Sequence, residues 1–148
     1  MKCEPKTPKE ILGAEKVIFA FGSWPCFHDA EVISFSAERE LPVRKGATTA
    51  RLAVHVREYE TVGEGTVDYD IKETKSVLIR FLFTGACDFE ISDFNLQNVI
   101  DSIEISQVDA DEPANLKVDI EPIWGFGGSL RCEVIEIESV EVLPIECV

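Results

Sequence analysis

The stretch Val77-Leu78-Ile79-Arg80-Phe81-Leu82-Phe83 decides the fold class of this sequence. In an extended conformation both of its faces are apolar except at Arg80. A strand that is apolar on both faces is typical of the middle of a covered sheet. The stretch is much shorter than the about 20 apolar residues that a membrane span requires. It therefore predicts the central strand of a folded domain.

The segments around this strand alternate between apolar and polar residues, as in strands with one buried face. They are residues 33–37, 52–56, 67–71, 87–91, 99–108, 116–120 and 130–143. Short turns join most of them without repeated helices, which favours antiparallel pairing. In the last segment the apolar positions shift between Val134 and Ile135, which predicts a β-bulge. We expect one domain over residues 1–148 that is mainly β, or α+β at most, with a single curved antiparallel sheet of about six to eight strands.

One short helix or turn-rich segment is expected before the strands, over residues 8–21. Thr7 can cap its first turn, and Pro8 suits the first helical position. Gly13 is a candidate break in the helix, and Gly22 ends any helix that reaches it.

The sequence is strongly acidic, with 28 acidic against 14 basic residues and a formal net charge of −14. In residues 88–148 only Lys117 and Arg131 are basic, against 15 acidic residues. Such a field repels nucleic acids and anionic membranes, and it favours basic proteins or cations as partners. A surface that serves solubility alone would have the same composition.

The cysteines and the N-terminus both favour the cytoplasm. Five cysteines form an odd number without a C-x-x-C spacing, which favours reduced thiols over a disulfide framework or a zinc site. The first residues, Met1 to Pro5, lack the apolar core of a signal peptide. We therefore expect a cytoplasmic protein.

The segment Gly22–Glu31 contains more candidate site residues than any other stretch of comparable length in the sequence. It combines large aromatic residues with an imidazole and carboxylates: Trp24, Phe27, His28, Asp29 and Glu31. Imidazole and carboxylate together can bind a transition metal, but on a strand His28 would face away from Asp29 and Glu31. We therefore favour a structural role, in which Trp24 and Phe27 are buried and His28 or Asp29 bonds nearby backbone. The alternative is a small-molecule- or metal-binding β domain, or an enzyme, that uses this segment with His55 or Trp124.

The sequence offers no convincing catalytic set. A Cys–His or Ser–His pair would need His28 or His55, and the acidic surroundings of Cys26 do not favour a thiolate. The sequence thus predicts a protein that is not an enzyme, with no catalytic residue, no metal and no cofactor. The amides Asn95, Gln97 and Asn98 are expected to cap a structural corner rather than form a recognition loop.

Three segments together resemble the immunity protein 50 family of bacterial polymorphic toxin systems. The first and most specific is Phe21-Gly22-Ser23-Trp24-Pro25-Cys26-Phe27-His28-Asp29-Ala30-Glu31-Val32-Ile33-Ser34. The other two are Asp93-Phe94-Asn95-Leu96-Gln97-Asn98-Val99-Ile100 and Gly128-Ser129-Leu130-Arg131-Cys132. The resemblance extends from about residue 11 to residue 142.

This resemblance implies a mainly β, non-catalytic protein that binds and neutralises a co-encoded toxin domain. The acidic charge suits a basic toxin such as a nuclease, which must bind a polyanion. As toxin contacts we expect Asp109, Asp111 and Glu112 on an acidic loop, together with Trp124 and Phe126. The expected partner is thus a protein rather than a nucleic acid or a membrane, and the oligomeric state is left open.

Overall fold

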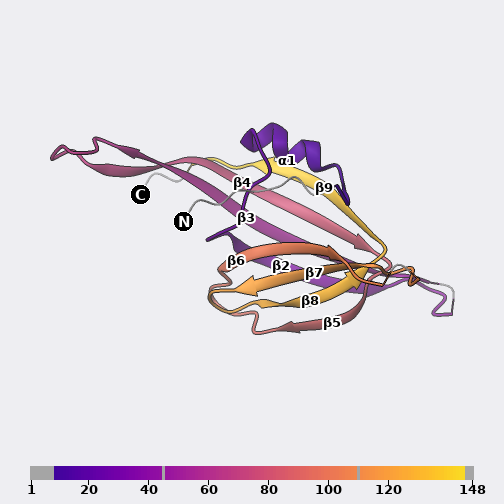
Figure 1. The fold of residues 1–148 in the computed structure, drawn as a ribbon. Coiled ribbons are helices and arrows are strands. Elements are labelled where there is room, and N and C mark those ends of the chain that lie inside the picture. The colour runs from indigo at the N-terminus through magenta and orange to yellow at the C-terminus, as the bar shows by residue number, and fades with distance from the viewer. Residues whose placement is uncertain (1–8, 45, 110, 146–148) are drawn as a thin grey trace.

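A computed structural model describes residues 9–44, 46–109 and 111–145 of the chain (Figure 1). In these residues the structure is mainly β, with one short helix. The elements in chain order are β1 (Ile11–Leu12), α1 (Ala14–Phe21), β2 (Glu31–Arg39), β3 (Thr48–Val62), β4 (Asp70–Thr84), β5 (Cys87–Ser92), β6 (Ile100–Gln107), β7 (Leu116–Pro122), β8 (Gly127–Cys132) and β9 (Val134–Val142). The mainly β class with an N-terminal helix is therefore confirmed.

The larger sheet has the strand order β1-β9-β4-β3-β2. β4 contains the apolar stretch 77–83 and lies in the middle, as its two apolar faces predicted. The separate strand expected at 67–71 is wrong: Ile71 belongs to β4, while Val67 and Tyr69 lie in the turn before it. Their alternation with charged residues imitates a half-buried strand, although all three side chains are exposed.

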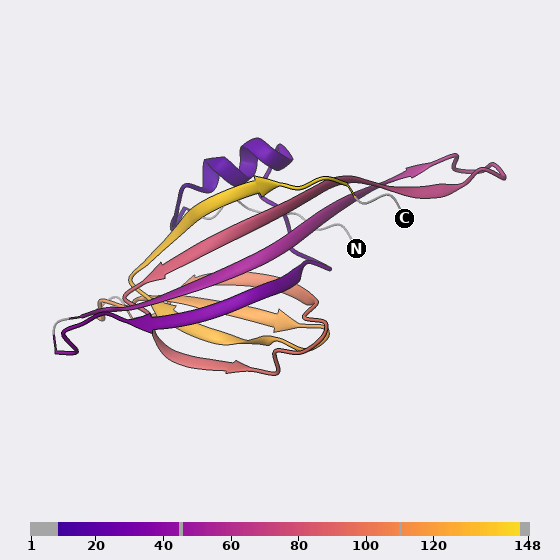
Figure 2. The same ribbon diagram turned by 180° about the vertical axis from the view of Figure 1, so that it is seen from behind.

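A second, smaller sheet has the order β5-β8-β7-β6, so the expectation of a single sheet is corrected. Figures 1 and 2 show it packed beneath part of the larger sheet. The chain leaves the larger sheet after Thr84 and returns at Glu133, where the Glu133 N–H donates to the Thr84 carbonyl over 2.9 Å. Phe35 of the larger sheet contacts Phe126, which directly precedes β8 of the smaller sheet, with ring centroids 5.6 Å apart. The buried residues of both sheets form one hydrophobic cluster.

The segment 130–143 is two strands rather than one strand with a bulge. β8 ends at Cys132 in the small sheet, and β9 begins at Val134 in the large sheet. The shift of apolar positions is real, because Cys132 and Ile135 are buried while Val134 is exposed. The shift marks the place where the chain passes from the small sheet to the large one. Each strand buries one face in its own sheet, so the pattern of buried positions starts anew at β9.

A bulge does occur in β2, where the register with β3 shifts between Val32 and Ser34. Val32 is consequently buried and Ile33 is exposed. The expected inward alternation of Ile33, Phe35 and Ala37 is therefore wrong at Ile33, and it is also wrong at Ala37, which is exposed; only Phe35 is half-buried. The bulge moves the buried face by one residue.

Helix α1 begins after Gly13, whose φ of 80° breaks the segment as expected. The expected helical start at Pro8 is wrong, because Ile11 and Leu12 form β1 and the helix begins only at Ala14. Thr7 and Pro8 themselves lie outside the described residues. The helix ends at Gly22, where the Gly22 N–H donates to the Ile18 carbonyl over 2.6 Å. Within the ranges that the structure covers, no helix is long and apolar enough to cross a membrane.

Candidate functional site

The segment Gly22–Glu31 is held in the core by its aromatic side chains. Trp24 is 5% exposed, and Phe27 is also buried. Both pack on Phe81 of the central strand β4, with ring centroids 6.5 Å and 6.0 Å away, and lie 5.7 Å from each other. Phe27 has a φ of 61°, a conformation that costs a bulky residue energy unless its surroundings fix it. The expected burial of the two rings is confirmed.

The same segment joins the two sheets through its backbone. The hydrogen bonds are Asp29 N–H to Ile100 O (3.0 Å), Ile100 N–H to Ala30 O (2.9 Å) and Val32 N–H to Asn98 O (2.8 Å). They connect the start of β2, at the edge of the large sheet, with the start of β6, at the edge of the small one. Two of the segments that carry the family resemblance therefore meet in space.

Of the two residues expected to bond nearby backbone, Asp29 does so through its own N–H, which donates to the Ile100 carbonyl, whereas the His28 side chain pairs with carboxylates. Its Nδ1 lies 2.8 Å from Asp101 Oδ1, and its Nε2 lies 3.5 Å from Asp29 Oδ2. All three side chains are more than half exposed. Exposed pairs of this kind contribute little to the stability of the fold. The main effect of the two carboxylates is therefore to orient the His28 ring at the surface.

The other side chains considered as metal ligands do not join this cluster. Glu31 Oε2 accepts the Asn98 backbone N–H over 3.4 Å, and His55 Nε2 lies 2.7 Å from Ser76 Oγ. Nowhere in the described ranges do three His, Cys, Asp or Glu side chains converge as a metal site would require.

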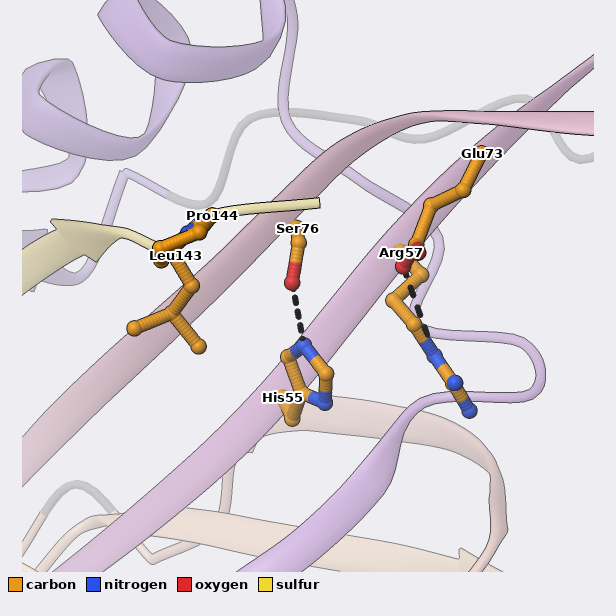
Figure 3. Close-up of a pocket in the computed structure, with 6 residues that line it drawn as sticks. All are labelled: His55, Arg57, Glu73, Ser76, Leu143 and Pro144. Carbon is orange, nitrogen blue, oxygen red and sulfur yellow. Dashed lines mark hydrogen bonds and ion pairs between the residues drawn. The ribbon is translucent and has the colours of Figure 1, made fainter. Parts of the chain in front are cut away.

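The His55–Ser76 pair lies on the large sheet, in a hollow at the base of the β3–β4 hairpin (Figure 3). Arg57 and Glu73 form a 4.0 Å ion pair in the same hollow. Ser76 is buried within a strand, and its carbonyl accepts the Leu143 N–H over 2.8 Å. A nucleophile needs an accessible oxygen beside free backbone donors. The pair is better suited to fixing the two strands.

Among the described cysteines, Cys26, Cys87 and Cys132 are free. Burial raises the pKa of the Cys132 thiol to about 12. Burial, followed by the neighbouring Asp88 carboxylate, also raises the pKa of Cys87. Both thiols therefore stay protonated at neutral pH and are weak nucleophiles.

Asn98 is the centre of the corner between the sheets. It is buried, and its Oδ1 accepts the backbone N–H groups of Asn95 and Phe126 over 2.7 Å and 3.1 Å. Its Nδ2 donates to the Asn95 carbonyl over 3.0 Å. Gln97 beside it is exposed. Asn98 therefore links the loop before β6 to the loop between β7 and β8.

The two linked loops present an exposed surface with two prominent apolar side chains. Leu96 is 97% exposed and Trp124 is 67% exposed, and both line one shallow hollow together with Asn95, Gln97 and Gly125. We call these five residues the Trp124 surface. Phe126 is fully buried beneath it, against Phe94 and Phe35. The prediction that Phe126 contacts a toxin is therefore wrong, because its buried ring cannot reach a partner.

The acidic loop lies at the opposite end of the small sheet. Strand β6 separates the Trp124 surface from Asp109, and its eight residues span about 25 Å. Asp109 Oδ1 accepts the Asp111 N–H over 3.0 Å, which shapes the loop. Glu112 follows, and all three acidic residues are exposed. The residues expected to contact a toxin thus fall into two separate places.

The sequence contains only weak signals for the residues that the structure adds. Leu96 stands alone among polar residues and has no period that marks it as exposed. Asp101 is 73 positions from His28 along the chain, and no spacing connects them. Only the pairing of β2 with the start of β6 brings these two side chains together.

The sequence is similar to a known protein family. A family model described as Immunity protein 50 matches residues 13–143 of the chain. Neither a curated protein nor a solved structure matches it.

Proposed function

The chain belongs to the immunity protein 50 family, and from that premise we propose that it is a non-catalytic protein that binds and neutralises a co-encoded toxin domain. It would act in the cytoplasm of the cell that makes it. The observation that carries the proposal is the Trp124 surface, where two large apolar side chains stand exposed on loops that Asn98 fixes. Exposed tryptophan in a fixed setting is characteristic of the residues that dominate protein–protein affinity.

The charge of the chain supports a basic partner. The net charge of −14 is concentrated after residue 87, in the part that forms the small sheet and β9. Opposite charge accelerates the encounter of two proteins and excludes wrong partners. A nuclease toxin has a cationic substrate site, so we propose such a toxin as the partner.

The Trp124→Ala change tests the binding surface. We expect the dissociation constant for the toxin domain encoded beside this gene to rise about 30-fold or more, since a central tryptophan commonly contributes at least about 2 kcal/mol. Leu41→Ala is the matched control, because Leu41 is 82% exposed in the loop between β2 and β3 at the opposite end. Titration calorimetry measures both variants. Equal affinity of the Trp124→Ala variant and the wild type would exclude this surface as the interface.

The acidic loop is proposed to steer association. The triple change Asp109→Asn, Asp111→Asn and Glu112→Gln should lower the association rate about three- to tenfold at low salt and leave the dissociation rate nearly unchanged. The Asp109→Asn change retains the side-chain oxygen that accepts the Asp111 N–H, so the loop should keep its shape. The difference should shrink as salt rises, since charges are screened beyond about 8–10 Å. Stopped-flow kinetics over a series of salt concentrations measures these rates. If the association rate depended neither on salt nor on the triple change, the loop would serve solubility only.

A further inference from the structure

The β3–β4 hairpin continues well past the sheet that contains it. β2 pairs with β3 only as far as His55, and β9 pairs with β4 only from Val77. We call residues 57–75 the arm. Its strands pair with each other out to Val62 and Asp70, and no further strand of the described chain flanks them. In Figures 1 and 2 the arm projects free of the body. Residues 57–62 of β3, at the rise of an extended strand, correspond to a length of roughly 20 Å.

The arm is an ordered feature at both of its ends. At its base the Arg57–Glu73 ion pair (Figure 3) is joined by a 3.7 Å pair between Lys75 and Glu58. Lys75 Nζ also lies 5.7 Å from the centre of the Phe21 ring of α1. At its tip Thr66 Oγ1 donates to the Gly63 carbonyl over 2.6 Å. These contacts give a hairpin of defined shape.

The arm exposes large apolar side chains that contribute nothing to the core. They are Tyr59, Val67, Tyr69 and Ile71, and each is more than half exposed. Thr61 pairs with Ile71, so Tyr59 and Ile71 project from the same face of the ribbon. An isolated two-stranded ribbon is marginally stable in water, and its bare edges invite aggregation. A short turn at the end of the sheet would avoid both costs.

The charge of the arm identifies the kind of partner that it suits. Between Tyr59 and Lys72 there are four carboxylates and one ammonium group. The carboxylates are Glu60, Glu64, Asp68 and Asp70, and all are exposed. Two such arms would repel each other, which argues against a second copy of this chain. A groove lined by lysine or arginine would complement the arm.

We propose that the arm enters a cationic groove of the toxin domain, with Tyr59 and Ile71 packing against its wall and the carboxylates facing its basic side chains. The inference rests on the proposed function and adds a second contact to it. In both Figures 1 and 2 the arm points the same way as the connection between β7 and β8, which carries Trp124. One partner can therefore contact the arm and the Trp124 surface together.

A shortened arm tests the proposal directly. Residues 59–74 are replaced by Asn-Gly, so that Glu58 and Lys75, which pair across the hairpin, flank a two-residue turn. With the toxin domain encoded beside this gene as the probe, we expect the dissociation constant to rise at least tenfold. The thermal unfolding midpoint should stay within a few degrees of the wild type, because the arm contributes no buried core residue between Tyr59 and Thr74.

Charge reversal at the tip tests the same contact without shortening the chain. Glu64→Lys with Asp68→Lys should weaken binding at least tenfold. Glu38→Lys with Glu40→Lys changes the net charge equally near the opposite end of the large sheet, and it should weaken binding less than threefold. Surface plasmon resonance measures both. This pair of variants decides the matter if the shortened protein does not fold.

The outcomes of these experiments separate the two proposals. A wild-type chain that does not bind the toxin domain would overturn both. Wild-type affinity in the shortened and tip-reversed variants would overturn the arm contact and leave the proposed function standing. Equal losses in the tip and control variants would assign the effect to net charge alone and also overturn the contact. A wild-type dimer that becomes monomeric on shortening, as measured by sedimentation, would assign the arm to a second copy instead.

Discussion

Replacement of Trp24 by alanine should lower the free energy of unfolding by about 3–5 kcal/mol. Trp24 is almost completely buried, and its ring packs edge-on against Phe27 and Phe81. The loss leaves a large cavity against the central strand and removes support for Phe27, which holds a left-handed backbone conformation. Because small domains are stable by only about 5–15 kcal/mol, this one change consumes much of the total. Urea denaturation followed by circular dichroism measures it.

The second tryptophan supplies the matched control. Trp124→Ala removes the same side chain from an exposed position, so we expect a change in unfolding free energy within about 0.5 kcal/mol. The two substitutions should therefore have different effects: the loss of Trp24 should lower stability, and the loss of Trp124 should weaken binding. If the Trp24→Ala variant unfolded like the wild type and lost toxin binding, Trp24 would be a contact residue and the structural role of its segment would be wrong.

The sequence predicted the centre of the fold better than its layout. The apolar stretch within β4 identified the central strand, although only the face of Val77, Ile79, Phe81 and Phe83 is fully buried and the opposite face, with Leu78 and Leu82, is half-buried. The division into two sheets was missed, since β8 and β9 alternate with the same period on either side of Glu133. The period of a strand records that one face is buried, without recording which sheet covers it.

The candidate site was predicted in a similar way. The burial of Trp24 and Phe27 follows from their size and could be anticipated. The partner of His28 could not be, because Asp101 meets it only through the pairing of two sheet edges. The arm was misinterpreted because exposed Val67, Tyr69 and Ile71 alternate like a half-buried strand. Exposed apolar residues that bind a partner carry the same pattern as residues that bind the core.

Asn98→Ala is expected to have the second-largest effect, lowering the free energy of unfolding by about 2–4 kcal/mol. The change leaves the N–H groups of Asn95 and Phe126 without their acceptor and the Asn95 carbonyl without its donor. An unsatisfied buried polar group costs about 1–3 kcal/mol, and water can satisfy those that become accessible. Chemical denaturation, with hydrogen exchange at Asn95 and Phe126, measures the effect.

The consequence for binding follows from what Asn98 connects. It fixes the loop of Leu96 against the loop of Trp124, so its loss should weaken toxin binding even at temperatures where the variant is fully folded. Asn95→Ala is the control for stability alone, because the exposed Asn95 Oδ1 accepts the adjacent Leu96 N–H, and its loss should lower the free energy of unfolding by less than about 1 kcal/mol. An Asn98→Ala variant that kept its stability but lost binding would place Asn98 in the interface. An Asn98→Ala variant that lost stability but bound the toxin normally when folded would show that the Asn98 hydrogen bonds are not needed for binding at the Trp124 surface.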